Sequence, residues 1–402
     1  MNRTYGEAKR TVALLVLCQA ISMTSITMLF TVAALIGAAL SSDKSLATLP
    51  VALLQVAVML TTIPASLIMQ RWGRRAGFGL GTVVGMVGAG LAVVAVLMQS
   101  FSLFCLATVL FGIFNGFAGF YRFAAADAAT DSFRPQAISL VVAGGVVAAV
   151  LGPSTASWAK DWLSVPFAGS LLPIVGLQAL TLVVLQSLDL LPMTIASGKS
   201  GAGESSRPLG IILRQPLFGV AAISSMVGYS VMVLLMTATP LAMTAVPHPF
   251  SQAAFVIQWH VLGMFAPSFV TGSLIQRFGV LNIILGGIGL NLLAIGINLN
   301  GTSVQNFLVA LTLLGIGWNW MFVGATTLLT QAYLPSEKAK TQAAHDFLMF
   351  SSVALSAFLS GRLLNSLGWA TVNQLATLPL LIALGAVLWL RFSPQAISPS
   401  EG

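Results

Sequence analysis

The sequence predicts an all-α membrane protein with twelve transmembrane helices in two pseudo-symmetric six-helix bundles. The first observation behind this prediction is composition, because hydrophobic residues make up 57% of the 402 residues and charged residues only 7%. Soluble domains carry about 25% charged residues, whereas a helix surrounded by lipid is apolar on every side. The other two observations are a series of long apolar segments and a motif that occurs twice.

Twelve apolar segments are long enough to cross the hydrocarbon core of a bilayer, which takes ~20 helical residues. We predict spans at residues 11–40, 48–69, 77–98, 102–130, 136–159, 166–189, 215–240, 251–275, 280–299, 304–332, 344–364 and 371–391. The longest polar segment, rich in Gly and Ser, separates the sixth span from the seventh and predicts a flexible linker. We therefore expect an N-terminal bundle at 1–190, a linker at 191–214 and a C-terminal bundle at 215–402.

A short basic motif occurs once in each predicted bundle. Gln70-Arg71-x-Gly73 follows the second span, and Gln276-Arg277-x-Gly279 follows the eighth, 206 residues later. Self-similarity on this scale indicates a repeated structural unit. The repeat therefore supports two similar halves.

Lysine and arginine are distributed unevenly over the predicted loops. With an even number of spans both termini lie on the same side, and the excess of basic residues predicts that this side is cytoplasmic. The other side receives only Lys44, Lys160 and Arg362. The cytoplasmic side receives Arg3, Lys9, Arg10, Arg71, Arg74, Arg75, Arg134, Lys199, Arg207, Arg214, Arg277, Lys338, Lys340 and Arg391.

Several function classes are disfavoured by the same residues. The net charge of +8 does not indicate nucleic-acid binding, because the basic residues lie in short loops rather than on one face. Cys18 and Cys105 lie inside apolar segments and suggest neither a disulfide nor a metal site. The residues Gly198-Lys199-Ser200 lack the upstream glycine of a phosphate-binding loop, since Met193 occupies that position. We expect no enzyme activity, no metal and no cofactor, because no catalytic constellation emerges.

The repeated motif resembles a loop of the major facilitator superfamily of secondary transporters. In that family Gly-x-Leu-x-Asp-Arg-x-Gly-Arg-Arg follows the second transmembrane helix, and a weaker copy follows the eighth. Gln70 and Gln276 stand where the family usually has aspartate, and Ser66 and Ile68 replace the first glycine and the leucine. A contact between helices that uses this carboxylate would therefore have to use an amide hydrogen bond here. The matching residues are Arg71, Gly73, Arg74 and Arg75 in the first copy and Gly272, Leu274, Arg277 and Gly279 in the second.

The resemblance implies two bundles that rock about a central cavity, so that the substrate site opens to each side in turn. It also implies a small-molecule substrate, a lipid bilayer as surroundings and a bacterial inner membrane as location, and we expect a monomer. We expect the motif loops to hold the outward-facing state on the cytoplasmic side. These gating residues are Gln70, Arg71, Gly73, Arg74, Arg75, Gln276, Arg277 and Gly279.

Charged residues inside membrane spans are costly and mark candidate functional sites. Arg122 lies roughly 15 Å of helical rise before the end of its span. Either it pairs with Asp127 or with backbone carbonyls to hold the helix in place, or it donates to a carbonyl or anionic group of the substrate. Asp127, Asp346 and His260 are candidates for proton coupling. The alternatives are a helix N-terminal carboxylate for Asp346 and a hydrogen-bonded packing residue for His260.

Aromatic and amide side chains gather on spans that line the cavity in the family. A planar ligand could stack on the rings while polar groups satisfy its edge, although core or lipid-facing positions remain the alternative for any single ring. We expect at most half of these residues to contact substrate. The candidates are Phe120, Tyr121, Arg122, Gln258, Trp259, Trp318 and Asn319.

Scarce membrane carboxylates disfavour a cationic substrate, and the aromatic residues with one arginine favour a planar polar or weakly anionic metabolite. The whole sequence is also similar to bacterial members of the superfamily that take up riboflavin, which makes riboflavin uptake the first specific hypothesis. The second is proton-coupled export of an aromatic or amphipathic compound, because Gly152-Pro153 partly resembles a motif of proton antiporters. A third is a non-transporting sensor or scaffold, which would usually carry an added soluble domain, whereas only residues 392–402 follow the last span.

Overall fold

The computed structural model describes residues 5–129, 134–188 and 207–393, and within these ranges all regular structure is helical. The prediction of an all-α fold is confirmed. The elements are α1 (Tyr5–Leu40), η1 (Lys44–Leu46), α2 (Leu49–Trp72), α3 (Arg74–Leu97), α4 (Phe101–Ala118), α5 (Tyr121–Ala128), α6 (Arg134–Ala159), α7 (Ala168–Gln186), α8 (Leu209–Leu213), α9 (Pro216–Ala245), α10 (Phe250–Phe265), α11 (Ser268–Phe278), α12 (Val280–Leu299), α13 (Val304–Leu329), η2 (Pro335–Glu337) and α14 (Lys338–Phe392).

The membrane-spanning helices follow the predicted segments closely. In the described ranges nine helical segments, or ten when the bent pair α10 and α11 counts as one, are long and apolar enough to cross a membrane. The last two predicted spans, 344–364 and 371–391, lie in the single element α14. Gly368 interrupts it with φ 78° and ψ 171°. With α6 at the predicted fifth span, these helices are consistent with twelve crossings.

Two predicted spans are broken in the middle. The span at 102–130 divides into α4 and α5 around Gly119-Phe120, and the span at 251–275 divides into α10 and α11, which meet at a bend of 44°. Pro267 lies at this second break, where its missing N–H removes a hydrogen bond from the helical ladder. The break before α5 gives Arg122 a position near the start of a new short helix.

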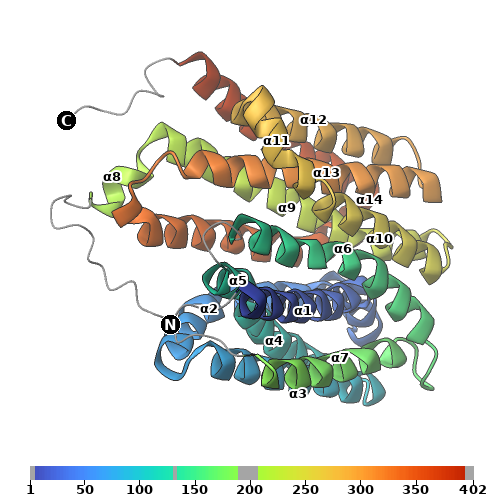
Figure 1. Ribbon diagram of the computed structural model, residues 1–402. Helices are drawn as coiled ribbons and strands as arrows, with labels where there is room; N and C mark the ends of the chain where they lie inside the picture. Colours follow the sequence, from blue (N-terminus) through green and yellow to red (C-terminus); the bar gives the residue numbers. More distant parts are fainter. Residues whose placement is uncertain (1–4, 130–133, 189–206, 394–402) are drawn as a thin grey trace.

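The helices form two halves, α1 to α7 and α9 to α14, which lie one above the other in Figure 1. Within the first half α1 packs on α6 and α7, and α3 packs on α4. Within the second half α9 packs on α14, and α12 packs on α13. The halves meet along two lines, α2 against α14 and α6 against α10, with α1 near α9. Each line pairs the second helix of one half with the fifth helix of the other, as expected for two equivalent halves.

Hydrogen bonds between the halves lie away from the repeated motif. The Gly361 N–H donates to the Thr48 hydroxyl oxygen (2.9 Å), and the Ser154 hydroxyl donates to the Gln258 side-chain carbonyl (3.1 Å). The Ser351 hydroxyl donates to the Met59 sulfur (3.4 Å) farther along α14 and α2. Nearer the motif, Arg122 of the first half is exposed and the Asp346 side chain of the second is half-exposed. We call the solvent-accessible region between the halves at Arg122 and Asp346 the crevice. We call the motif-bearing end the basic end, because it carries Arg71, Arg75, Arg214, Arg277 and Arg391.

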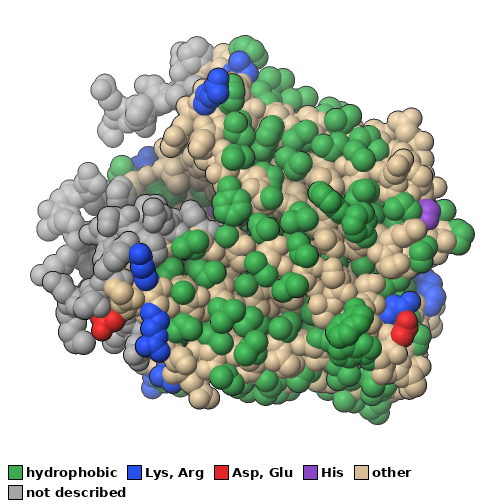
Figure 2. Space-filling view, turned by 45° about the vertical axis from the view of Figure 1, so that its right-hand side comes forward, with side chains coloured by type: hydrophobic (Ala, Val, Ile, Leu, Met, Phe, Trp, Pro, Cys, Tyr) green, Lys and Arg blue, Asp and Glu red, His purple; other side chains and the backbone are tan. Residues whose placement is uncertain are grey.

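The surface matches a protein embedded in lipid. Hydrophobic side chains cover the middle of the face in Figure 2, and Lys and Arg side chains gather toward its two ends. The start of α1, the short helix α8 and the end of α14 lie at the same end of the molecule (Figure 1). Apolar side chains in the middle and charges at the ends are what a bilayer of hydrocarbon between two aqueous layers selects.

The two motif turns have the same backbone conformation. Gly73 has φ 86° and ψ 157°, and Gly279 has φ 84° and ψ 149°. Each glycine is the single residue between two helices. This region of conformational space is essentially restricted to glycine, and an added Cβ at either position would meet nothing within 4 Å. Glycine is therefore needed here for its backbone conformation, and not because a side chain would clash with its neighbours.

We expect Gly73→Ala and Gly279→Ala each to destabilise the turn by ~1–3 kcal/mol, because alanine is strained in this conformation. The measurement is the midpoint of thermal unfolding of each purified variant in detergent, with membrane insertion unchanged. Gly296→Ala is the matched control, since Gly296 is helical and also has open space around it. Equal midpoints for Gly73→Ala and Gly296→Ala would contradict the backbone argument.

Candidate functional site

The wall of the crevice on the first half is an arginine between aromatic rings. The Arg122 guanidinium carbon lies 4.8 Å from the centroid of the Phe123 ring, a cation–π distance. The Phe120 and Phe123 rings are 6.0 Å apart, and Phe123 is 48% exposed. Arg122 is solvent-accessible, yet protein atoms surround it on most sides. It therefore lies in a recess and not on the outer surface.

The opposing wall carries a carboxylate on α14. Asp346 is close enough to Arg122 to interact with it electrostatically, and its side chain is 51% exposed. It follows the first residue of α14, Lys338, by more than two helical turns. The alternative that Asp346 is a helix N-terminal carboxylate is therefore wrong, because the dipole effect is confined to the first turn.

Two buried residues behind Asp346 were not among the predicted site residues. The His345 Nδ1 atom lies 3.0 Å from Asp346 Oδ1, and its Nε2 atom lies 2.7 Å from the Ser225 hydroxyl on α9. His345 and Ser225 are almost inaccessible to solvent. The adjacency of His345 to Asp346 was a usable signal in the sequence. Ser225 gave none, because it is 120 residues away.

Asp127 has a different partner from the one considered in the sequence. Its carboxylate accepts a hydrogen bond from the Arg74 guanidinium. The Arg74 side chain is 6% exposed and the Asp127 side chain 64%. The pairing of Arg122 with Asp127 is therefore wrong, and Asp127 instead ties the end of α5 to the first motif turn.

Three predicted site residues are each buried inside one of the two halves. Tyr121 is buried against Phe78, with ring centroids 4.4 Å apart. Asn319 donates to the Met264 carbonyl (2.8 Å) and accepts from the Thr271 hydroxyl (2.7 Å), so it fastens α13 to the bend between α10 and α11. Because these side chains are almost inaccessible to solvent, we correct Tyr121 and Asn319 from substrate contacts to packing residues.

His260 is the third buried candidate. Its Nδ1 atom lies 2.8 Å from the Leu311 carbonyl oxygen, and the ring is fully buried between α10 and α13. A Cβ added to Gly315 would overlap with the His260 carbonyl oxygen, which shows how closely the two helices approach. The packing alternative therefore describes His260 better than proton exchange with the crevice.

An aromatic cluster lies beside His345 in the second half. Trp318 and Phe322 are stacked with centroids 5.1 Å apart and an interplanar angle of 7°, and the Tyr229 ring stands perpendicular to both. Phe350 lies 6.3 Å from Tyr229. Tyr229 is one turn after Ser225 on α9, and Phe350 is one turn after Asp346 on α14. The cluster thus extends the wall that carries Asp346, and three of its rings were not predicted.

Gln258 lies at the contact between α6 and α10, and the neighbouring Trp259 is exposed on α10. Gln258 borders a groove of about 290 Å³, and Trp259 is exposed with its ring 6.3 Å from Phe255. Besides Gln258, the groove is lined by Ser154, Ser157, Trp158, Ser251, Ala254 and Phe255.

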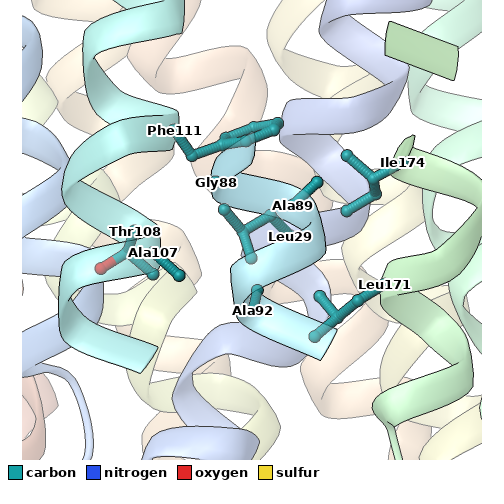
Figure 3. Close-up of a pocket in the computed structure, with 9 residues that line it drawn as sticks. All are labelled: Leu29, Gly88, Ala89, Ala92, Ala107, Thr108, Phe111, Leu171 and Ile174. Atoms are coloured by element: carbon teal, nitrogen blue, oxygen red, sulfur yellow. The ribbon is translucent and has the colours of Figure 1, made fainter. Parts of the chain in front are cut away.

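A second cavity lies inside the first half, where side chains from α1, α3, α4 and α7 converge (Figure 3). Its volume is about 10 Å³, roughly the space of one water molecule. Thr108 contributes the one hydroxyl among its nine lining residues. It is a packing defect and cannot hold a metabolite.

Most gating residues are exposed at the basic end. Gln70, Arg71, Arg75, Gln276 and Arg277 are exposed, whereas Arg74 is buried against Asp127. In the described ranges no group of three or more His, Cys, Asp and Glu side chains comes together to hold a metal ion.

The end of the predicted linker is bound to the second half. The Arg207 guanidinium donates to both Glu337 carboxylate oxygens (2.8 and 2.7 Å), and the Arg207 N–H donates to Oε1 (2.8 Å). Lys340 donates to the Arg207 carbonyl. Hydrogen bonds from Arg207 lower the pKa of the buried Glu337 to about 2, although burial opposes the shift. Residues 191–206 of the linker lie outside the described residues.

We expect Glu337→Gln to destabilise the protein by about 2 kcal/mol at pH 7, because it removes charge-assisted hydrogen bonds from a partly exposed arginine. The folded pKa is depressed from 4.5 to about 2. The stabilisation is therefore complete above pH 4.5 and is lost as the pH falls toward 2. Thermal unfolding at several pH values measures it.

Asp161→Asn is the control for that substitution, since Asp161 is 73% exposed and 3.6 Å from Lys160. Exposed pairs of this kind contribute little. A Glu337→Gln variant as stable as Asp161→Asn at pH 7 would contradict the role of the ion pair in fastening the linker.

The comparisons with known proteins agree with this architecture. The family model described as Major Facilitator Superfamily matches residues 15–257. The chain is 40% identical over 389 residues to the riboflavin transporter RfnT of Brucella anthropi, a match that covers 96% of this chain and 97% of that protein. It is 27% identical to the uncharacterised MFS-type transporter YddS of Bacillus subtilis, covering 95% of this chain and 91% of that one.

Among solved structures, a mutant of the nucleoside transporter NupG superimposes with a TM-score of 0.74. The superposition covers 94% of this chain and all of that one, at 12% sequence identity. At this identity the likeness concerns the fold alone.

Proposed function

The chain belongs to the major facilitator superfamily of secondary transporters, and we propose that it takes up riboflavin, or a similar planar aromatic metabolite, across a bacterial inner membrane. The relative that shares 40% of its residues over almost the whole chain is a riboflavin transporter. The crevice between the halves is the proposed path.

The observation that carries the proposal is the chemistry of the two walls. Riboflavin has a flat, apolar ring system with an imide edge, and a chain of hydroxyl groups. The exposed Phe123 ring and the partly buried Phe120 ring offer a stacking surface, and the guanidinium donates to carbonyl oxygens of the imide edge. Asp346 accepts from hydroxyl or imide N–H groups on the opposite side. Of the predicted substrate contacts we retain Arg122 and Phe120, and we add Phe123.

The arrangement of the halves supports a scheme for gating. We place the basic end in the cytoplasm by the positive-inside rule, with both termini there. The crevice then faces inward, because Arg122 and Asp346 lie nearer the motif than the hydrogen bonds between the halves do. Uptake requires an outward-facing state in which the motif turns at Gly73 and Gly279 approach the other half. A monomer is sufficient for this motion, and Asp346 is the best placed of the three candidates for a coupled proton.

Export is the second candidate, and its support is weaker. The Gly152-Pro153 motif lies in α6, where a Cβ on Gly152 would come within 2.8 Å of the Thr27 side chain on α1. Close packing of two helices is therefore a sufficient reason for this glycine. A sensor or scaffold is disfavoured, because the family and the full-length relatives are transporters.

The test is rescue of a riboflavin-requiring bacterium that lacks its own transporter, grown at limiting vitamin. We expect the wild type to rescue growth and Arg122→Ala to lower initial uptake at least tenfold, since a bidentate donor is lost. Arg214→Ala is the matched control, because this arginine is exposed at the basic end outside the crevice.

Rescue by both wild type and Arg122→Ala would support riboflavin as the substrate but would show that Arg122 does not contribute to its binding site. No rescue, with the protein shown by immunoblot to be in the membrane, would overturn riboflavin uptake and favour export.

A further inference from the structure

The crevice contains opposite charges on its two walls. Arg122 belongs to α5 of the first half and Asp346 to α14 of the second, and Asp346 is close enough to act on the Arg122 guanidinium electrostatically. A ligand between them meets a cation on one side and an anion on the other. This arrangement is unusual for a site that would attract an anion, because phosphate sites gather positive charge.

Asp346 is held in place by a chain of hydrogen bonds that runs into the core. An ionised carboxylate only accepts, so His345 Nδ1–H donates to Asp346 Oδ1 (3.0 Å). In the neutral ring Nε2 then accepts from the Ser225 hydroxyl (2.7 Å). When the ring is protonated, Nε2 donates instead, and the Ser225 hydroxyl turns to the Ala221 or Ala222 carbonyl (3.1 and 3.0 Å). Both ring nitrogens of His345 and the Ser225 hydroxyl therefore have hydrogen-bond partners whether the ring is neutral or protonated.

The geometry divides the carboxylate of Asp346 between two tasks. Oδ1 is bonded to a histidine that is 1% exposed, and that histidine is bonded to a fully buried serine. The Asp346 side chain as a whole is half-exposed, so the carboxylate is also accessible to solvent. Because His345 is fixed at both ring nitrogens, Asp346 cannot readily turn away when a ligand enters. The carboxylate is therefore held at a fixed position in the crevice and is not a mobile surface group.

We propose that Asp346, positioned by His345 and Ser225, determines specificity by balancing the charge of Arg122. The site then selects an uncharged planar solute that offers hydroxyl or imide donors, and it rejects the same solute carrying a phosphate. Fixed charges in a partly dehydrated crevice interact strongly. The repulsion of a phosphate dianion by Asp346 therefore offsets its attraction to Arg122. This inference rests on the proposed function, since it concerns the same site.

The experiment compares binding of riboflavin and riboflavin 5′-phosphate to the purified full-length protein, followed by quenching of flavin fluorescence. For the wild type we expect the phosphorylated form to bind at least tenfold more weakly. In Asp346→Asn that ratio should fall about tenfold, because Arg122 is left without its counter-charge. Asp346→Glu should keep the ratio near that of the wild type.

The positioning role of His345 has its own readout. His345→Ala should shift the ratio in the same direction as Asp346→Asn, and His345→Gln should restore part of it, because an amide can still donate to the carboxylate. A merely structural role would weaken both flavins equally and leave the ratio unchanged. Asp161→Asn is the matched control, since it is the same chemical change at an exposed carboxylate in the loop after α6.

The outcomes separate the two proposals. Failure of the wild type to bind or take up riboflavin would overturn the proposed function. Riboflavin binding by the wild type, with the same ratio for the wild type and a folded Asp346→Asn, would overturn the specificity role and leave uptake standing. A ratio that shifts equally in Asp161→Asn would also overturn it, because the effect would then be one of net charge.

Discussion

Charge inside a membrane span is costly unless it is paired or solvated, and this constraint accounts for much of the molecule. Charged residues amount to 7% of the chain, and the few within or at the ends of the helices have recognisable tasks. Arg74 and Asp127 join the first motif turn to α5, and Arg207 and Glu337 fasten the linker to the second half. Asp346 acts electrostatically on Arg122 across the crevice. Two of these pairs hold one half together, whereas the third relates the halves to each other.

The way the helices pack within and between the halves bears on how such a molecule can move. Inside the halves, glycines bring helices into backbone contact, as at Gly112 against Leu54 and at Gly263 against Thr312. Side-chain amides such as Asn319 add hydrogen bonds across helices. Between the halves, α2 packs on α14 and α6 packs on α10, and the hydrogen bonds at Thr48, Ser154 and Ser351 are single side-chain bonds. Two internally packed bodies that meet along two helix pairs are suited to rigid-body rocking.

Several features were predictable because their causes are local. The apolar segments, the repeat and the two motif glycines depend on the composition and backbone needs of short stretches. The predicted spans accordingly agree with the helices, and Gly73 and Gly279 share one conformation. The bend at Pro267 was also accessible from its missing N–H but was not predicted. Asp346 was recognised as a candidate, although its place two turns inside α14 removed the helix-end interpretation.

The sequence by itself determined that the chain is helical, where it crosses the membrane and which turns need glycine. A helix in lipid satisfies its own backbone hydrogen bonds, so these features follow from each segment alone. Only the tertiary structure decided which side chains meet. Asp127 pairs with Arg74, Ser225 bonds to His345 from 120 residues away, and Tyr121 turns into the core. The physical reason is that lipid and protein interior are equally apolar. The helices therefore lack the polar face that in water-soluble proteins shows which side is buried.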